Sequence, residues 1–193
     1  MAILKTTTPA STVLDSCDFN DNIFSGLNRL FMVTPGIRFD SVTEFETLSG
    51  WTTLLTAGSI DQLDGIVNVV DQSEQPAYYK GLNGENILVK PGRIIHDYYF
   101  SYTNDFHKIL RDFDQGLYEV FLSDRNGNIY GTSDDLVTVR GFRVNLINVQ
   151  KRAFGSQQKV FSIVRVEYAD FVEWDANSVI SNVTWINDRL ITT

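Results

Sequence analysis

The sequence has little cysteine, histidine or proline and no long apolar run, and these shortages exclude whole classes of protein. Cys17 is the only cysteine among 193 residues, so an intrachain disulfide and a cysteine-rich zinc site cannot form. No apolar run reaches the roughly 18 residues of a membrane helix. The first residues lack the apolar core of a signal peptide. We therefore expect a protein that is made in the cytoplasm and has no membrane contact.

Basic side chains are also scarce. The chain has 16 basic and 24 acidic side chains and a net charge of −8, which argues against simple binding to a nucleic-acid backbone. The distribution is uneven, because residues 140–165 carry six bases and no acids, whereas residues 1–139 carry 19 acids and nine bases. The six bases are Arg140, Arg143, Lys151, Arg152, Lys159 and Arg165. An acidic chain thus contains one purely basic stretch.

What is present suits one globular domain over residues 1–193. Hydrophobic residues make up 43% and aromatic residues 12% of the chain, and a domain of this size buries about 70% of its unfolded surface. Residues 1–26, rich in Thr, Ser, Asp and Asn, predict an arm. Residues 59–91 hold several glycines, prolines and acids around short β-prone pieces, which predicts an inserted loop or hairpin.

Few helices are expected. Ser41 with Glu44 forms a capping box before a short helix, and Ser49 is a candidate cap for a second one that Gly58 closes. The clearest helix starts after Asn104, the expected N-cap. One apolar stripe runs along it at helical spacing. The stripe consists of Phe106, Ile109, Leu110 and Phe113.

Most of the remaining chain has β character. Arg93–Tyr102 is an aromatic strand, and Asn126-Gly127 predicts a type I′ hairpin. Residues 136–149 and 159–171 form long β-rich runs that predict a hairpin carrying much of the basic stretch. The expected fold is mainly β (α+β): a β-sandwich or barrel flanked by one amphipathic helix, with a long excursion loop or hairpin and an N-terminal arm.

No residue pattern points to catalysis. His96 and His107 each have an aspartate nearby, but no nucleophile motif accompanies either, so both are interpreted as ordinary histidines. A calcium loop beginning at Asp124 would need Gly at position six and Glu at position twelve, where Ile129 and Asp135 stand. The hairpin interpretation is favoured, and calcium at residues 124–135 stays open. We expect no enzyme activity, no cofactor and no metal.

The basic stretch has three interpretations. It is an ordinary mixed surface, it meets an acidic surface of a neighbouring subunit, or it binds single-stranded nucleic acid together with its phenylalanines. Trp174, beside two acids, is expected at an exposed strand end, where an aromatic anchor suits an interface. The candidate inter-subunit contact residues are Arg140, Arg143, Lys151, Arg152, Lys159 and Trp174.

Three stretches resemble virion structural proteins of tailed bacteriophages of the crAss-like and related kind. They are Pro35–Ser41 with the helices that follow, Gly92-Arg93 with the aromatic strand and Phe106–Leu110, and Asp124–Gly131 with Gly141-Phe142. The resemblance covers residues 28–170 and rests on turn and core patterns, so it assigns no binding residue. Within that group the closest architectural analogue is the tail-tube or tail-ring subunit. Such a subunit has a β-sandwich or barrel, one flanking helix, a long loop and a terminal arm.

The resemblance implies a structural subunit that self-assembles into a ring or tube of a phage tail and surrounds the DNA passage. The expected partners are further copies of the chain in a ring, of which a hexamer is one candidate, other virion proteins, and DNA in transient, non-specific passage. The protein would be made in the bacterial host cytoplasm and end in the virion. Charge reversal at Arg140, Arg143 and Arg152 is expected to abolish assembly while the monomer stays folded.

Two alternatives share the composition. A capsid or head–tail joining accessory protein would differ in the symmetry of its assembly. A carbohydrate-binding β-sandwich module would expose an aromatic platform, for which Tyr98, Phe100 and Tyr102 are the candidates because alternation places them on one face of a strand. That face is expected to belong to the core.

Overall fold

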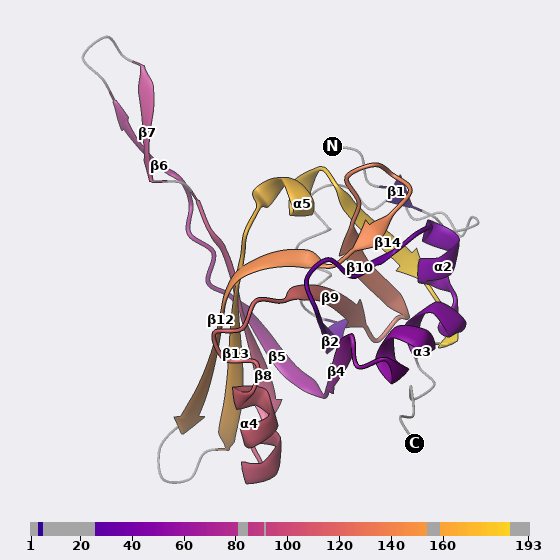
Figure 1. Cartoon of the computed structure of the whole chain (residues 1–193). Coiled ribbons are helices and arrows are strands. Elements are labelled where there is room, and N and C mark those ends of the chain that lie inside the picture. The colour runs from indigo at the N-terminus through magenta and orange to yellow at the C-terminus, as the bar shows by residue number, and fades with distance from the viewer. Residues whose placement is uncertain (1–3, 6–25, 81–84, 91, 154–158, 186–193) are drawn as a thin grey trace.

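Most strands belong to one hydrogen-bonded network that bends into two antiparallel sheets (Figure 1). The computed structural model describes residues 4–5, 26–80, 85–90, 92–153 and 159–185. The first sheet contains β1 (Leu4–Lys5), β2 (Leu27–Val33), β3 (Arg38–Phe39), β4 (Ile60–Asp64), β9 (Glu119–Asp124), β10 (Asn128–Thr132), β11 (Val139–Arg140) and β14 (Ser178–Asn182). The second contains β5 (Ile66–Asp71), β8 (Ile94–Ser101), β12 (Phe142–Ala153) and β13 (Val160–Tyr168).

The two sheets are joined at two bends. β12 pairs with β9 at Phe142 and Arg143, then with β13 from Val144 onward, and its register shifts between Val144 and Leu146. β4 continues into β5 through Gly65, whose φ of +85° suits glycine. Strands that bend from one sheet into another form the corners of a sandwich.

The prediction of a mainly β fold is confirmed. Of the two architectures expected, the barrel is wrong for the described residues, because the strand order is open and runs from β1 to β5. Side chains from both sheets meet in one core cluster, for example Leu30 and Leu122 from the first and Tyr98 and Val164 from the second. The two sheets therefore pack face to face.

A second core covers the other face of the first sheet. The helices α2 (Val42–Glu46) and α3 (Leu48–Thr56) bring Phe45 and Trp51 onto Phe31 and Phe121 of β2 and β9. The ring centroids of Trp51 and Phe121 are 5.2 Å apart, and the indole N–H of Trp51 donates to the carbonyl of Phe45 at 2.7 Å. Because β9 is covered on both faces, its apolar residues are consecutive and do not alternate with polar ones.

Two of the helix starts differ slightly from expectation. Ser41 caps α2 as predicted, accepting from the Glu44 N–H at 3.1 Å, but the Glu44 side chain accepts from the N–H of Asp40. The N-cap of α3 is Thr47, two residues before the expected cap at Ser49.

The helix α4 (Asn104–Arg111) begins one residue earlier than expected. Its N-cap is Thr103, whose hydroxyl accepts from the Phe106 N–H at 3.3 Å. Leu110 and Phe113 are buried, but Ile109 is exposed. The helix α5 (Phe171–Asp175) was not predicted, since residues 159–171 looked like a continuous β run.

The β9–β10 hairpin forms at the expected place with a different turn. A type I′ turn needs positive φ at both central residues, yet among residues 125–127 only Gly127 has positive φ, at +86°. The Asp124 carboxylate closes the turn by accepting from the N–H groups of Asn126 and Asn128 at 2.8 and 2.9 Å. Hydrogen bonds to the Asp124 side chain therefore hold this turn, and positive φ at both central residues is not needed.

The segment boundaries also differ from expectation. Residues 60–71, expected in an inserted loop, form β4 and β5 of the two sheets. The hairpin itself is shorter and consists of β6 (Ala77–Lys80) and β7 (Asn86–Lys90). Most of the predicted arm over residues 1–26 lies outside the described residues; Leu4 and Lys5 form β1, which pairs parallel with β14.

Candidate functional site

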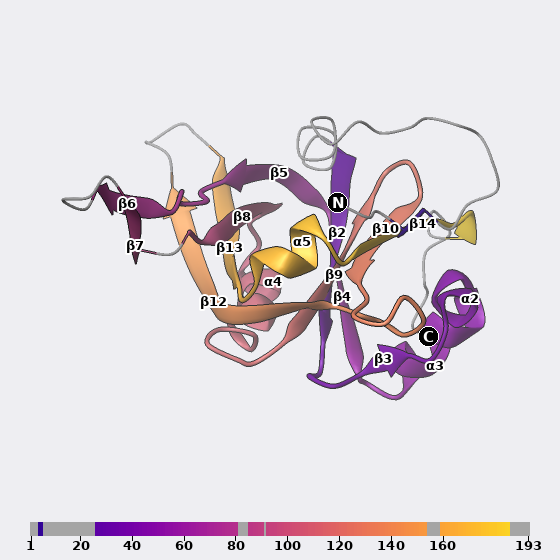
Figure 2. The same cartoon turned by 90° about the horizontal axis from the view of Figure 1, so that it is seen from above.

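The most prominent surface feature is the β6–β7 hairpin, which we call the ribbon. It continues the β5–β8 pair outward, because the Gln72 N–H donates to Ile95 at 2.8 Å and Glu74 and Arg93 exchange backbone hydrogen bonds of 2.8 and 2.9 Å. The ribbon projects away from the body and pairs with no other strand among the described residues (Figures 1 and 2).

The ribbon is apolar on both of its faces. Four large side chains are 53–67% exposed: Tyr78, Tyr79, Leu88 and Val89. Tyr78 pairs with Leu88, so these two lie on one face and Tyr79 lies on the other, while Val89 stands where the register shifts between the Ala77–Lys90 and Tyr78–Leu88 pairs. An isolated two-stranded hairpin is marginally stable, and exposed apolar clusters mark interaction sites. This geometry suits insertion into a partner that covers both faces.

Two of the predicted contact arginines bind a buried acid of the same chain. The side chain of Glu173 on α5 is 2% exposed, and it accepts from the Arg140 guanidinium at 3.0 Å, from the Arg143 Nε and from the Arg143 backbone N–H at 2.8 Å. Arg140 also binds Asp134 at 2.8 Å, and this hydrogen bond lowers the pKa of the Asp134 carboxyl. Charge reversal at Arg140 or Arg143 would therefore damage the monomer itself, contrary to expectation.

A third arginine of the basic stretch is used in the same way. Arg165 makes a two-pronged contact with Asp97, with distances of 2.7 and 2.8 Å, and Asp97 is buried. A bidentate pair of this kind is among the stronger charge-assisted contacts. The three arginines thus neutralise acids that folding has buried, and they do not form a free basic surface.

The two lysines of the basic stretch, Lys151 and Lys159, lie away from the arginine–acid pairs. The Nζ of Lys151 stands 4.3 Å from the centre of the Tyr102 ring, and Lys159 is exposed. Arg152 lies in β12, with its side chain outside the described part. The pKa of His107 is lowered by partial burial and by the positive charges of Arg111 and Lys151, so these groups share one end of the molecule.

Trp174 is not at an exposed strand end. It lies on α5, is buried, and stacks on Phe142 with ring centroids 4.4 Å apart and an interplanar angle of 12°. The tryptophan therefore holds α5 against the sheets, and its exposure was wrongly predicted because the acids beside it suggested a surface position.

Each histidine lies beside a hydroxyl group of the fold. His96 is buried beside Tyr98, with its Nδ1 3.2 Å from the tyrosine hydroxyl, and the hydroxyls of Tyr98 and Tyr168 are 2.6 Å apart. Burial lowers the pKa of His96 to about 4, while Asp71 and Asp97 oppose that shift. The Nδ1 of His107 lies 3.0 Å from the hydroxyl of Ser162. Tyr98 and Phe100, two of the candidates for an aromatic platform, are buried in the core.

The candidate calcium loop has its carboxylates engaged locally. Asp124 accepts from the Asn128 side-chain amide and the Tyr130 hydroxyl, each at 2.7 Å, in addition to its two backbone contacts. Asp135 accepts from the N–H groups of Val137 and Thr138. Over the residues that the structure describes, no group of three or more His, Cys, Asp and Glu side chains is arranged to hold a metal ion.

None of the helices within the described ranges combines the length and the apolar character needed to cross a bilayer. Comparison with protein-family models, with curated proteins and with solved structures finds no match of the chain to any of them.

The sequence predicted a hairpin within residues 59–91 but did not identify the apolar side chains that the hairpin exposes. The signal was present in two apolar runs of the sequence, Tyr78-Tyr79 and Ile87-Leu88-Val89, on either side of Gly81 and Gly84. Consecutive residues of a strand point to opposite faces, so Tyr78 and Tyr79 must place one ring on each face of a two-stranded ribbon.

Proposed function

We propose that the protein is a structural virion subunit that self-assembles into a ring or tube of a phage tail and surrounds the DNA passage. The observation that carries self-assembly is the ribbon, which presents Tyr78, Tyr79, Leu88 and Val89 to solvent on two faces. A soluble chain with a net charge of −8 gains nothing from such a surface unless a partner covers it.

The assignment to a virion rests on the resemblance of residues 28–170 to tailed-phage virion proteins. The fold is compatible with that role, because a two-sheet body with a projecting ribbon offers separate surfaces for the two sides of a subunit contact. Contacts between unlike surfaces generate closed rings when the rotation between neighbours closes, and open tubes or filaments when it does not.

Light scattering after size exclusion, followed by negative-stain electron microscopy, tests the proposal. We expect the full chain to form rings or tubes, and the double variant Tyr79→Ser/Leu88→Ser to stay monomeric and folded, with a cooperative thermal unfolding transition. The matched control is Leu48→Ser/Val137→Ser, which removes two exposed apolar side chains outside the ribbon and should assemble as the natural chain does. A natural chain that remains a monomer at every concentration would overturn the proposal.

A further inference from the structure

A second uncovered apolar region lies on the body, around α4. The exposed large apolar side chains Ile109, Leu117 and Leu146 come from α4, from the turn after it, and from the adjoining part of β12. The Gln115 N–H donates to the Ile147 carbonyl at 2.9 Å, and the Val149 N–H donates to the Asp114 carboxylate at 2.9 Å. These bonds attach the turn to β12, so the turn has a fixed position on the two-sheet body.

The same region carries charges of both signs, because Asp105, Asp112 and Asp114 accompany four cations. Lys108 and Arg111 occupy the last turn of α4, while Lys151 and Lys159 come from β12 and the residue before β13. We call this region the α4 end: residues 104–118, residues 146–151 and Lys159. Cations attract the faces of aromatic rings, and Lys151 already stands over Tyr102 in this way. Tyrosines supplied by another molecule would fit the cations and apolar side chains of this surface, where Lys108 also lies 3.9 Å from Asp105.

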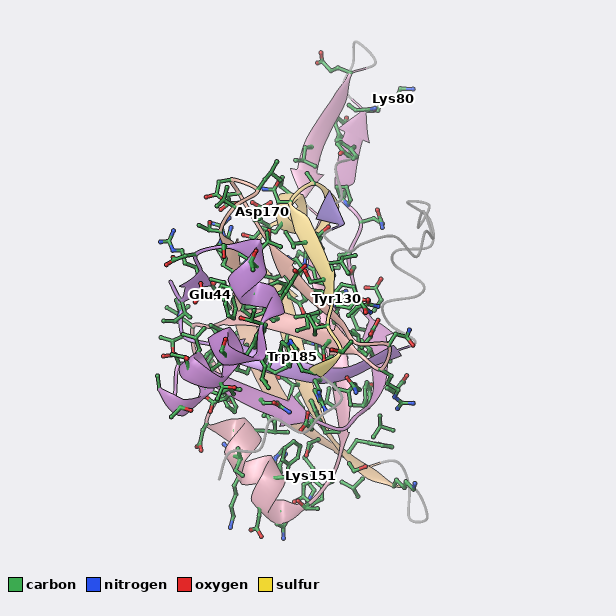
Figure 3. The ribbon with its side chains drawn as sticks, turned by 90° about the vertical axis from the view of Figure 1, so that its right-hand side faces the viewer. Glu44, Lys80, Tyr130, Lys151, Asp170 and Trp185 are labelled. Atoms are coloured by element: carbon green, nitrogen blue, oxygen red, sulfur yellow. The ribbon has the colours of Figure 1, made fainter. Side chains whose placement is uncertain are left out.

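The ribbon and the α4 end lie at opposite ends of the molecule. Figure 1 shows β6 and β7 projecting from one end, with α4 and the far ends of β12 and β13 at the other. Figure 3 shows the same separation after a quarter turn, with Lys80 on the ribbon and Lys151 at the α4 end. Neither surface can therefore cover the other within one copy.

We infer that the ribbon of one copy docks on the α4 end of a second copy, so that subunits join head to tail. The inference rests on the proposed self-assembly and names its two surfaces. A two-fold contact between two ribbons would leave Ile109 and Leu117 exposed. A head-to-tail contact brings the apolar region of one subunit's ribbon onto that of the next subunit's α4 end, places ribbon tyrosines near the cations there, and repeats without limit or closes into a ring.

Mixing two variants tests this polarity. The ribbon variant Tyr79→Ser/Leu88→Ser keeps a natural α4 end, and the α4-end variant Ile109→Glu/Leu117→Glu keeps a natural ribbon. Each alone should be monomeric, and an equal mixture should give a one-to-one dimer of twice the monomer mass that grows no further. An α4-end variant that assembles as the natural chain does, while the ribbon variant does not, would overturn the inference and leave self-assembly standing. A natural chain that is always monomeric would overturn both.

Cysteine cross-linking gives a second test, which detects the contact between two copies directly and does not depend on a variant that fails to assemble. In a Cys17→Ser background, Tyr79→Cys and Leu117→Cys are made singly and together. We expect no oxidative cross-link in either single variant, a covalent dimer when the two are mixed, and a ladder of multimers from the double variant. A covalent dimer from Tyr79→Cys alone would show ribbon-to-ribbon pairing and would contradict the head-to-tail contact.

Discussion

At the scale of single residues, the decisive group is the Glu173 carboxylate. It is 2% exposed and accepts from both Arg140 and Arg143, so two arginines that looked available to a partner bind an acid of their own chain. Burying a charge is costly unless hydrogen bonds and an opposite charge compensate it. The three charges therefore depend on one another, and a change to Glu173 removes a partner from both arginines, of which Arg140 keeps Asp134 and Arg143 keeps Asp170.

Replacing Glu173 with Gln should destabilise the fold. Neutralising the carboxylate leaves Arg140 with only its Asp134 partner and should lower the free energy of unfolding by about 3 kcal/mol, the cost of breaking a buried ion pair. The control is Asp170→Asn, because Asp170 is 40% exposed and lies 3.6 Å from Arg143, where a loss of less than about 1 kcal/mol is expected. Urea unfolding measures both variants, and equal losses would contradict this account.

His96 should make stability depend on pH. Burial lowers its pKa from 6.5 in the unfolded chain to about 4 in the fold, so between these values the unfolded state binds more protons. The contribution is fully present above pH 6.5 and is lost as the pH falls toward 4, to a total of about 3 kcal/mol.

The His96→Gln variant isolates this effect. The difference between its unfolding free energy and that of the natural chain should change between pH 7 and pH 4, because groups other than His96 cancel in the subtraction. Urea titrations at several pH values provide the measurement. Parallel pH curves for the two proteins would show that His96 does not titrate in this range.

At the scale of elements, the bends in β12 and between β4 and β5 divide the strands into two sheets. β12 changes partner where its register shifts between Val144 and Leu146, and β4 turns into β5 at Gly65. A hydrophobic pattern does not show which strand lies beside each segment, because the pairing partners are distant in the sequence. The bends depend on which strands are available as neighbours.

Gly65→Ala should weaken the β4–β5 bend. An added Cβ meets no atom within 4 Å, so any cost comes from the φ of +85° and should be about 1–2 kcal/mol. The control is Gly26→Ala, whose φ is not positive and whose Cβ would make an ordinary 3.5 Å contact with Asp124. Thermal unfolding compares the two. A Gly65 variant as stable as the Gly26 variant would contradict the role given to this bend.

At the scale of the whole molecule, the two ends differ. The ribbon exposes apolar side chains on both faces beside Lys80, and the α4 end combines apolar side chains with charges of both signs. A molecule with two unlike, mutually suited ends joins to copies of itself in one direction. The net charge of −8 would limit the proposed association to matching surfaces, because like-charged bodies repel one another.

Assembly should therefore appear in the stability of the protein. Partners that bind only the folded chain raise its melting temperature with concentration. We expect the melting temperature of the natural chain to rise as its concentration is raised a hundredfold, and that of Tyr79→Ser/Leu88→Ser to stay constant. Differential scanning fluorimetry across that range measures it, and equal behaviour of the two proteins would speak against ribbon-mediated association.

The sequence by itself determined the features that depend on near neighbours. The mainly β character, the Ser41 cap, the helix at 104–111 and the hairpin around Asn126-Gly127 follow from spacing and turn chemistry over a few residues. The uneven charge is likewise a property of the chain. These effects act locally, so a linear pattern is enough to reveal them.

Only the tertiary structure decided which charges and apolar groups remain free. Arg140 and Arg143 meet Glu173 across 33 and 30 residues, and Arg165 meets Asp97 across 68. Trp174 became buried because α5 packs on β12, whereas Tyr78 and Tyr79 became exposed because the ribbon leaves the body. Burial and ion pairing depend on contacts between distant segments, so the candidate interface could be recognised only after the chain had folded.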